Sequence, residues 1–183
     1  MNVVFLDRDG TIIRDPEDER VDAEEKIELF PDSIEALRYL AKHQYAVILI
    51  TNQAGIAEGR INQKDFERIN GKVIEMLSES GVQVLKTYMC PHGPEDGCEC
   101  RKPKPTMIKE ALKEFDLNPE RVYMVGDRES DIMAGISAGT KTVLVQTANV
   151  PVVATLATYT APHLLDAAKY IVGALAGTQS HTA

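Results

Sequence analysis

Short runs of apolar residues alternate along this chain with longer segments whose apolar positions recur every three to four residues. The short runs are typical of buried strands, and the longer segments are typical of helices that bury one face. The expected strands span residues 3–6, 45–50, 82–89, 121–125 and 141–145. The expected helices span residues 31–43, 63–80, 106–115, 130–138 and 163–176. Thr106 is expected to cap its helix. Strands and helices that alternate in this way predict an α/β fold, with a parallel sheet covered by helices on both faces.

The segments between these elements are predicted to be loops. Residues 11–30 are polar and acidic with little periodicity, and Gly55 and Gly59 mark a second loop. The segments between Thr11 and Pro31 and between Asn52 and Met89 are occupied by loops and core elements, so we expect no large cap domain. One domain over residues 1–176 is therefore predicted, followed by a loose tail at residues 177–183.

Polar clusters follow four of the five expected strands. They read D-R-D-G-T from Asp7, T-N-Q from Thr51, the cysteine-rich segment that ends in Arg101-Lys102, and G-D-R-E-S-D from Gly126. The carboxyl ends of parallel strands meet at one edge of a sheet, where ligands bind in open α/β folds. We therefore expect the four clusters to converge on one site.

The first and the last of these clusters contain four aspartates: Asp7, Asp9, Asp127 and Asp131. Crowded carboxylates repel one another unless a cation lies among them, and Mg²⁺ is the usual hard cation beside phosphate. Taken singly, an acidic pair is more often a solvated loop, and Asp131 suits the first turn of any helix. Their joint placement at strand ends favours a metal site.

All three cysteines of the chain lie beside a histidine in the segment from Cys90 to Cys100. The spacing of Cys90, His92, Cys98 and Cys100 predicts one tetrahedral zinc site. A disulfide would leave one cysteine over and would need an oxidising compartment. A four-ligand zinc site has no open position, so its expected task is to hold the loop that carries Arg101 and Lys102.

The bulk composition limits the partners. The formal net charge is -8 and the sequence pI is about 5.0, which argues against nucleic acid as a partner. The strongest apolar run, residues 45–50, is too short to span a membrane. The first residues lack a basic segment and a small-residue cleavage site, so we expect no signal peptide and a cytoplasmic location. A monomer is expected.

The motifs D7-R-D-G-T11, Thr51, Lys102 and G126-D-R-E-S-D131, in this order, resemble those of the haloacid dehalogenase (HAD) superfamily of phosphatases. The resemblance implies a Rossmann-like fold and a phosphomonoesterase that acts on a small phosphorylated metabolite through an aspartyl-phosphate. It implies that Asp7 is the nucleophile and that Asp9 is the general acid and base, kept protonated by negatively charged neighbours. Lys102 and Thr51 would stabilise the phosphoryl group, with Lys104 as a competing candidate for the role of Lys102. Asn52 and Arg101 would bind the substrate. The implied magnesium ligands are Asp7, the backbone carbonyl of Asp9, Asp127 and Asp131.

The segment C90-P-H…C98-E-C-R-K-P is similar to the zinc-loop branch of this superfamily, which holds heptose 1,7-bisphosphate phosphatases and histidinol-phosphate phosphatases. The segment from Thr51 to Arg60 resembles the heptose enzymes. The five-residue spacer from His92 to Cys98 resembles the histidinol-phosphate enzymes. Of the possible substrates, D-glycero-D-manno-heptose 1,7-bisphosphate is the one that we expect. Histidinol phosphate, a nucleic-acid 3′ end and a zinc-stabilised binding module without activity are the alternatives.

The sequence gives little support to the hypothesis of a serine hydrolase. Gly135 to Gly139 fits G-x-S-x-G, but that motif needs a strand before the serine and a helix after it. Ser137 is instead expected near the end of a helix. The sequence contains no G-x-G-x-x-G and no G-x-x-x-x-G-K-[ST] motif, so nucleotide-binding loops find no support either.

Overall fold

In a computed structural model of the chain, which describes residues 1–18, 20–147 and 155–178, six parallel strands form one sheet in the order β3–β2–β1–β4–β5–β6. The strands are β1 (Asn2–Leu6), β2 (Tyr45–Asn52), β3 (Gln83–Cys90), β4 (Tyr123–Gly126), β5 (Lys141–Val145) and β6 (Tyr159–Ala161). The first five correspond to the predicted strands. β6 was not predicted, because three residues are too few to show an apolar pattern and two of them are not buried.

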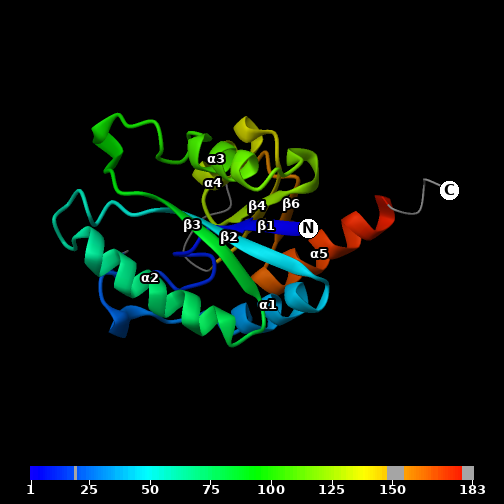
Figure 1. Ribbon diagram of the computed structural model, residues 1–183, viewed down its shortest axis with the longest axis horizontal. Coiled ribbons are helices and arrows are strands. Elements are labelled where there is room, and N and C mark those ends of the chain that lie inside the picture. Colours follow the sequence, from blue (N-terminus) through cyan, green and yellow to red (C-terminus); the bar gives the residue numbers. More distant parts are fainter. Residues whose placement is uncertain (19, 148–154, 179–183) are drawn as a thin grey trace.

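Helices cover both faces of this sheet, as predicted (Figure 1). They are α1 (Ser33–Lys42), α2 (Gln63–Ser78), α3 (Thr106–Glu114), α4 (Glu129–Ala138) and α5 (Leu164–Thr178). α1, α2 and α5 pack on one face, and α3 and α4 pack on the other. None of the described helices is long and apolar enough to cross a membrane.

The alternation of side chains along the central strand explains the two cores. Val4 and Leu6 of β1 belong to the apolar cluster beneath α1, α2 and α5, whereas Val3 and Phe5 belong to the cluster beneath α3 and α4. Successive side chains of a strand point to opposite faces of the sheet, so a strand buried on both sides must be apolar throughout. This is why β1 reads as one continuous apolar run.

Most element boundaries differ from the prediction by one or two residues, and the following differences bear on local structure. Thr106 does not cap α3: Pro105 is the residue before the helix, and the Thr106 hydroxyl donates to the carbonyl of Glu99 at 2.7 Å. Arg121 lies in a 3-10 turn (Pro119–Arg121) before β4, because a proline begins that turn. α5 continues to Thr178, two residues beyond its expected end. The other residues of the predicted tail, 179–183, lie outside the described residues, and the interpretation of residues 1–176 as one domain stays a prediction.

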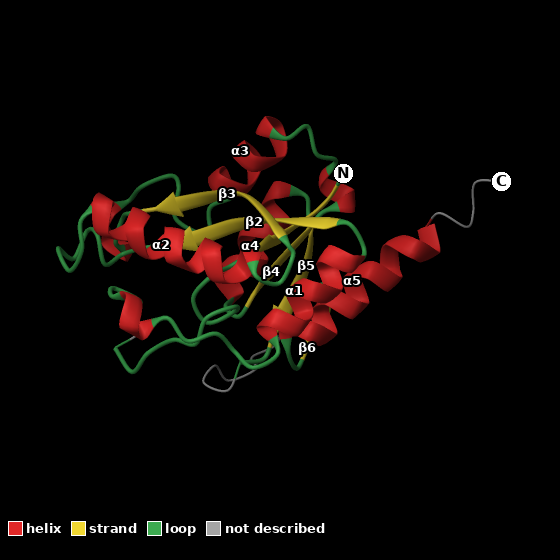
Figure 2. Ribbon diagram, turned by 60° about the horizontal axis from the view of Figure 1, so that its bottom comes forward, coloured by secondary structure: helices red, strands yellow, loops and turns green. Residues whose placement is uncertain are grey.

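The path of the chain creates a crevice at the carboxyl edge of the sheet. From β1 the chain runs to β2 and β3 on one side, then returns to β4 on the other side of β1. Such a reversal of strand order leaves a gap beyond the strand ends, where open α/β folds bind ligands. In Figure 2 the arrowheads of β2 and β3 point towards the long loops at this edge. Between β1 and α1, and between β2 and α2, the described residues form only loops and one 3-10 turn (Glu24–Lys26), so no large cap covers the edge.

Candidate active site

Three of the predicted carboxylates meet at the gap between β1 and β4. Asp7 follows β1, and its backbone N–H donates to the carbonyl of Val125 in β4 at 2.9 Å. Asp127 follows β4, and Asp131 lies in the first turn of α4. All three are buried, and each offers an oxygen within 4.8 Å of the others. The structure therefore brings Asp7, Asp127 and Asp131 together, as the strand-end argument predicts.

The turn after Asp9 depends on a glycine. Gly10 has a φ of +83°, and a Cβ atom at this position would lie 2.5 Å from Oδ2 of Asp127. Any other residue would be strained by the backbone and would push the Asp127 carboxylate out of the cluster. The glycine of D-R-D-G-T thus keeps space for the acidic cluster.

Burial gives this cluster unusual proton affinities. Burial raises the pKa of Asp7 well above its ordinary value, against the opposing effect of the Lys102 ammonium. Burial, with the nearby Asp131, raises the pKa of Asp127 to about 7. Carboxyl groups in this state favour a cation among them, because a cation stabilises their charged forms. The residues present therefore fit a divalent, oxygen-liking metal ion such as Mg²⁺.

Lys102 contacts the same cluster from the loop after β3. Its Nζ donates to Oδ1 of Asp7 at 2.6 Å and to the carbonyl of Ile50 at 2.7 Å. It also lies 2.6 Å from Oδ1 of Asp131. Burial alone would lower the pKa of Lys102, but Asp131 and Asp7 hold it above its ordinary value. Lys104, the competing candidate, points elsewhere: its Nζ donates to the carbonyl of Cys98 and to Glu99.

Asp9 has different neighbours from those expected. Its carboxylate accepts hydrogen bonds from Nε and Nη2 of Arg8, at 2.8 and 2.9 Å, and from Nε2 of Gln53, at 2.7 Å. The expectation that negatively charged groups surround Asp9 is wrong, because its partners are a guanidinium and an amide. The side chain remains 19% exposed and lines the cavity described next.

A cavity of about 190 Å³ opens above the cluster, and Thr51, Asn52 and Arg101 line it. The Thr51 hydroxyl accepts a hydrogen bond from Nε2 of Gln53 at 2.8 Å. The Asn52 amide is already engaged: Nδ2 donates to the carbonyl of Lys102 at 3.2 Å, and Oδ1 accepts from its backbone N–H at 3.1 Å. Asn52 thus fixes the backbone of Lys102, a contact that the sequence does not reveal.

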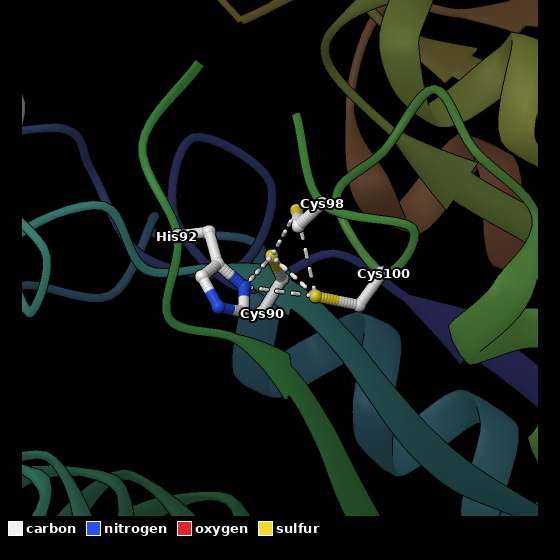
Figure 3. A group of neighbouring side chains, drawn as sticks. All are labelled: Cys90, His92, Cys98 and Cys100. Atoms are coloured by element: carbon white, nitrogen blue, oxygen red, sulfur yellow. Dashed lines mark hydrogen bonds between the residues drawn. The ribbon is translucent and has the colours of Figure 1, made fainter. Parts of the chain in front are cut away.

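The predicted zinc ligands also converge (Figure 3). Sγ of Cys90 lies 2.8 Å from Sγ of Cys100 and 3.6 Å from Sγ of Cys98, and Nδ1 of His92 lies 3.2 Å from Sγ of Cys100. All three cysteines are free thiols. Burial raises the pKa of the Cys90 thiol to about 12, so a cation is needed to favour its thiolate at neutral pH. This donor set suits a tetrahedral zinc ion.

Arg101 connects the loop that carries the predicted zinc ligands, residues 90–100, with the wall of the cavity. Its Nη1 donates to the carbonyl of His92 at 3.0 Å. The guanidinium of Arg101 therefore stays at the cavity wall while the next residue, Lys102, reaches the acidic cluster. The structure supports the idea that this loop positions two cations.

Comparison with known proteins agrees with this geometry. A family model described as HAD-hydrolase-like matches residues 99–167. The D-glycero-beta-D-manno-heptose-1,7-bisphosphate 7-phosphatase of Helicobacter pylori strain J99 is 42% identical over 147 residues, which cover 80% of this chain and 83% of that protein. The chain belongs to the haloacid dehalogenase superfamily of phosphatases.

Two further comparisons bear on this HAD phosphatase. The structure of D,D-heptose 1,7-bisphosphate phosphatase from Bordetella bronchiseptica, complexed with magnesium and phosphate, aligns with a TM-score of 0.85 at 31% identity. The alignment covers 95% of this chain and 99% of that one. The bifunctional histidine biosynthesis protein HisB of Campylobacter jejuni is 32% identical over 140 residues, which cover 76% of this chain but only 40% of that protein.

Several residues that form the site of this HAD phosphatase were not among the site residues predicted from its sequence. Arg8 and Gln53 contact Asp9, and Asp15, Arg20 and Arg128 line the cavity. Arg128 stands inside G-D-R-E-S-D, and Gln53 inside T-N-Q, so their positions in these motifs were the available signal. The loop residues Asp15 and Arg20 carry no such signal.

The rejected serine motif lies away from this site. Ser137 is exposed within α4. Gly135 packs where a Cβ atom would lie 2.6 Å from the Thr142 side chain, so this glycine allows α4 to approach β5.

Proposed function

We propose that the chain is a Mg²⁺-dependent phosphatase that removes the 7-phosphate of D-glycero-D-manno-heptose 1,7-bisphosphate. The observation that carries this proposal is the buried cluster of Asp7, Asp127 and Asp131, joined by Lys102 below an open cavity. The names of the relatives at 36–42% identity support the substrate.

In the proposed reaction, a carboxylate oxygen of Asp7 attacks phosphorus, and the bond between phosphorus and the ester oxygen breaks. Asp9 gives a proton to the departing sugar oxygen. Water then attacks the aspartyl-phosphate and passes a proton to Asp9, and inorganic phosphate leaves as the Asp7 carboxylate is restored. Lys102, held 2.6 Å from Asp7, stabilises the charge that develops on the phosphoryl oxygens.

We propose that Asp7, Asp127, Asp131 and the backbone carbonyl of Asp9 hold Mg²⁺. The ion would neutralise charge on the phosphoryl group and on the carboxylates around it. Thr51, near the end of β2, offers a hydroxyl to the same cavity.

The rim of the cavity supports a substrate with a second anionic group. Three arginines line the cavity in addition to Lys102: Arg20, which is paired with Glu58, Arg128, which is paired with Asp15, and Arg101. A guanidinium presents parallel donors that match a phosphate group. Because no large cap closes the site in the described part of the chain, contacts of this kind would select the substrate.

Histidinol phosphate is the second candidate. The HisB relative and the five-residue spacer of the cysteine loop favour it. The deciding experiment compares kcat/KM for heptose 1,7-bisphosphate, histidinol phosphate and a panel of sugar monophosphates. We expect the heptose bisphosphate to lead by at least about tenfold, with phosphorus NMR showing loss of the 7-phosphate. A lead for histidinol phosphate would replace the proposed substrate, and no turnover even of p-nitrophenyl phosphate would favour a binding module.

The pH dependence of the metal-free protein should reveal the acidic cluster. The pKa of Asp127 is raised from 3.8 to about 7, so the folded state holds this proton more tightly than the unfolded chain does. This contribution to stability is complete below about pH 4 and is lost as the pH rises through about 7. Mg²⁺ favours the charged cluster, so its stabilising effect should grow as the pH rises from about 6 to about 8.

Thermal unfolding with and without added Mg²⁺, at constant ionic strength, would measure this effect. Asp127→Asn is the matched control, and its response to Mg²⁺ should be smaller and less dependent on pH, with Asp7 still present. An equal response of the unaltered protein at every pH would contradict the proposed cluster.

We propose that Cys90, His92, Cys98 and Cys100 hold one structural zinc ion. Cys98→Ser should then lower the unfolding midpoint by roughly 5–10 °C, since the ion links residues on both sides of the loop. A chelator should shift the unaltered protein in the same direction and should have little further effect on the variant. Metal analysis should find one zinc per chain, and protein purified without chelator that contained none would remove this proposal.

The monomeric state and cytoplasmic location also stay predictions.

A further inference from the structure

Arg8 stands between the two aspartates of D-R-D-G-T and is completely buried. Its Nε and Nη2 donate to the two carboxylate oxygens of Asp9, at 2.8 and 2.9 Å. Its Nη1 donates to Oδ1 of Asn70 at 3.4 Å, and its guanidinium lies 5.5 Å from the centre of the Phe66 ring. A buried cation is costly unless an anion and hydrogen-bond acceptors surround it. Asp9 and Asn70 supply the acceptors here.

The contact between Arg8 and Asp9 fixes the orientation of the Asp9 carboxylate. A guanidinium that donates through two parallel N–H groups constrains the plane of its carboxylate partner as well as its distance. Gln53 adds a third donor at 2.7 Å to the same carboxylate. With three directed bonds, rotation of the carboxylate about its Cβ–Cγ bond is restricted.

Arg8 is itself held by the fold. Asn70 and Phe66 both belong to α2, and Nδ2 of Asn70 donates to the Thr87 hydroxyl in β3 at 3.0 Å. Arg8 itself lies in the turn after β1, but its guanidinium is held by α2, which is in turn hydrogen-bonded to β3. A site residue supported in this way keeps its geometry through the reaction.

Arg8 does not line the cavity, whereas Asp9 does. Any effect of Arg8 on catalysis must therefore pass through another residue. We propose that Arg8 is a positioning residue that aims the Asp9 carboxyl group at the leaving oxygen and then at the attacking water. This inference rests on the proposed function, in which Asp9 transfers those protons.

A double-mutant cycle with heptose 1,7-bisphosphate tests the inference. Arg8→Lys keeps the charge but loses the two parallel donors, and it should lower kcat by about 30-fold, a part of the 10²- to 10⁴-fold effect that proton transfer contributes. In an Asp9→Asn background the same change should cost less than about threefold, because the residue through which Arg8 acts is already disabled. A purely structural role would cost the same factor in both backgrounds, and this result would overturn the inference.

The leaving group provides a second readout. p-Nitrophenolate departs without a proton, so the first step with p-nitrophenyl phosphate does not need Asp9 as an acid. In Arg8→Lys the rate of the initial burst of p-nitrophenolate should stay within about threefold of that of the unaltered protein. The phosphate release that follows needs Asp9 as a base and should become slower. A burst slowed as much as the steady state would count against the inference.

Controls separate this inference from folding and from the proposed function. Arg14→Lys is the matched control, because its guanidinium also lies over a ring, that of Phe30, but its side chain is 45% exposed; its kcat should stay within about twofold of the unaltered protein. If Arg8→Lys does not fold, Arg8→Met in the Asp9→Asn background removes both partners of the Arg8–Asp9 ion pair together. That variant should match Asp9→Asn within about threefold, and a tenfold further loss would overturn the inference. An unaltered protein that cleaves no phosphate ester would refute the proposed function itself.

Discussion

Replacing Asp7 by Asn should lower kcat by about 10⁴-fold or more, while the protein still folds and binds zinc. Asn is nearly the same size as Asp, but its amide is a poor nucleophile and cannot form the acyl phosphate that a carboxylate forms. The change also removes one of three crowded carboxylates, so the cost to stability should be small. Lys102 would keep its contacts with Asp131 and with the carbonyl of Ile50. Release of phosphate from heptose 1,7-bisphosphate at saturating Mg²⁺ measures the effect.

Two observations decide whether Asp7 is the nucleophile. The unaltered enzyme, quenched with acid after mixing with ³²P-labelled substrate, should retain label on the chain, and Asp7→Asn should retain none. Asp15→Asn is the matched control, because Asp15 also lines the cavity but is bonded to Arg128 at 2.9 Å. Its label should persist. Appreciable turnover by Asp7→Asn would assign the attack to another group.

The position of the site could be predicted because it depends on backbone order. Val3 to Leu6 can be recognised as a buried strand from four residues, and Asp7 must then lie at the strand's carboxyl end. The same argument places Asp127 after β4. Once the strands are parallel and β4 lies beside β1, the two carboxylates are neighbours whatever the loops do.

The partners of each side chain could not be predicted in the same way. The pairing of Asp9 with Arg8 and Gln53 depends on where α2 and the end of β2 place their side chains. The use of the Asn52 amide to hold Lys102 depends on the course of the loop after β3. β6 could not be predicted, because an edge strand of three residues, paired only with β5, shows almost no pattern of apolar and polar positions. Such details follow from packing in three dimensions, which periodicity along the chain does not record.

Lys102→Met should lower kcat/KM for heptose 1,7-bisphosphate by about 10²- to 10³-fold, or roughly 3–4 kcal/mol of transition-state stabilisation. Methionine keeps the length and the apolar stem of lysine but lacks the ammonium that lies 2.6 Å from Asp7. Among the described residues, Lys102 is the only cation within salt-bridge distance of Asp7, and the variant would leave Asp7 without it. The pKa of Asp7, already raised by burial, should rise further, so activity should move to higher pH as well as fall.

Lys104→Met is the matched control, because it removes an identical group two positions along the same loop. The Lys104 ammonium bonds to Glu99 and to the carbonyl of Cys98, and it does not line the cavity. Its loss should change kcat/KM by no more than about threefold, with zinc content unchanged. Steady-state kinetics of the two variants, measured side by side, would therefore assign the phosphoryl contact. A large loss with Lys104→Met and a small one with Lys102→Met would reverse the assignment. Comparable large losses with both would mean that the loop, rather than one ammonium, is what the reaction requires.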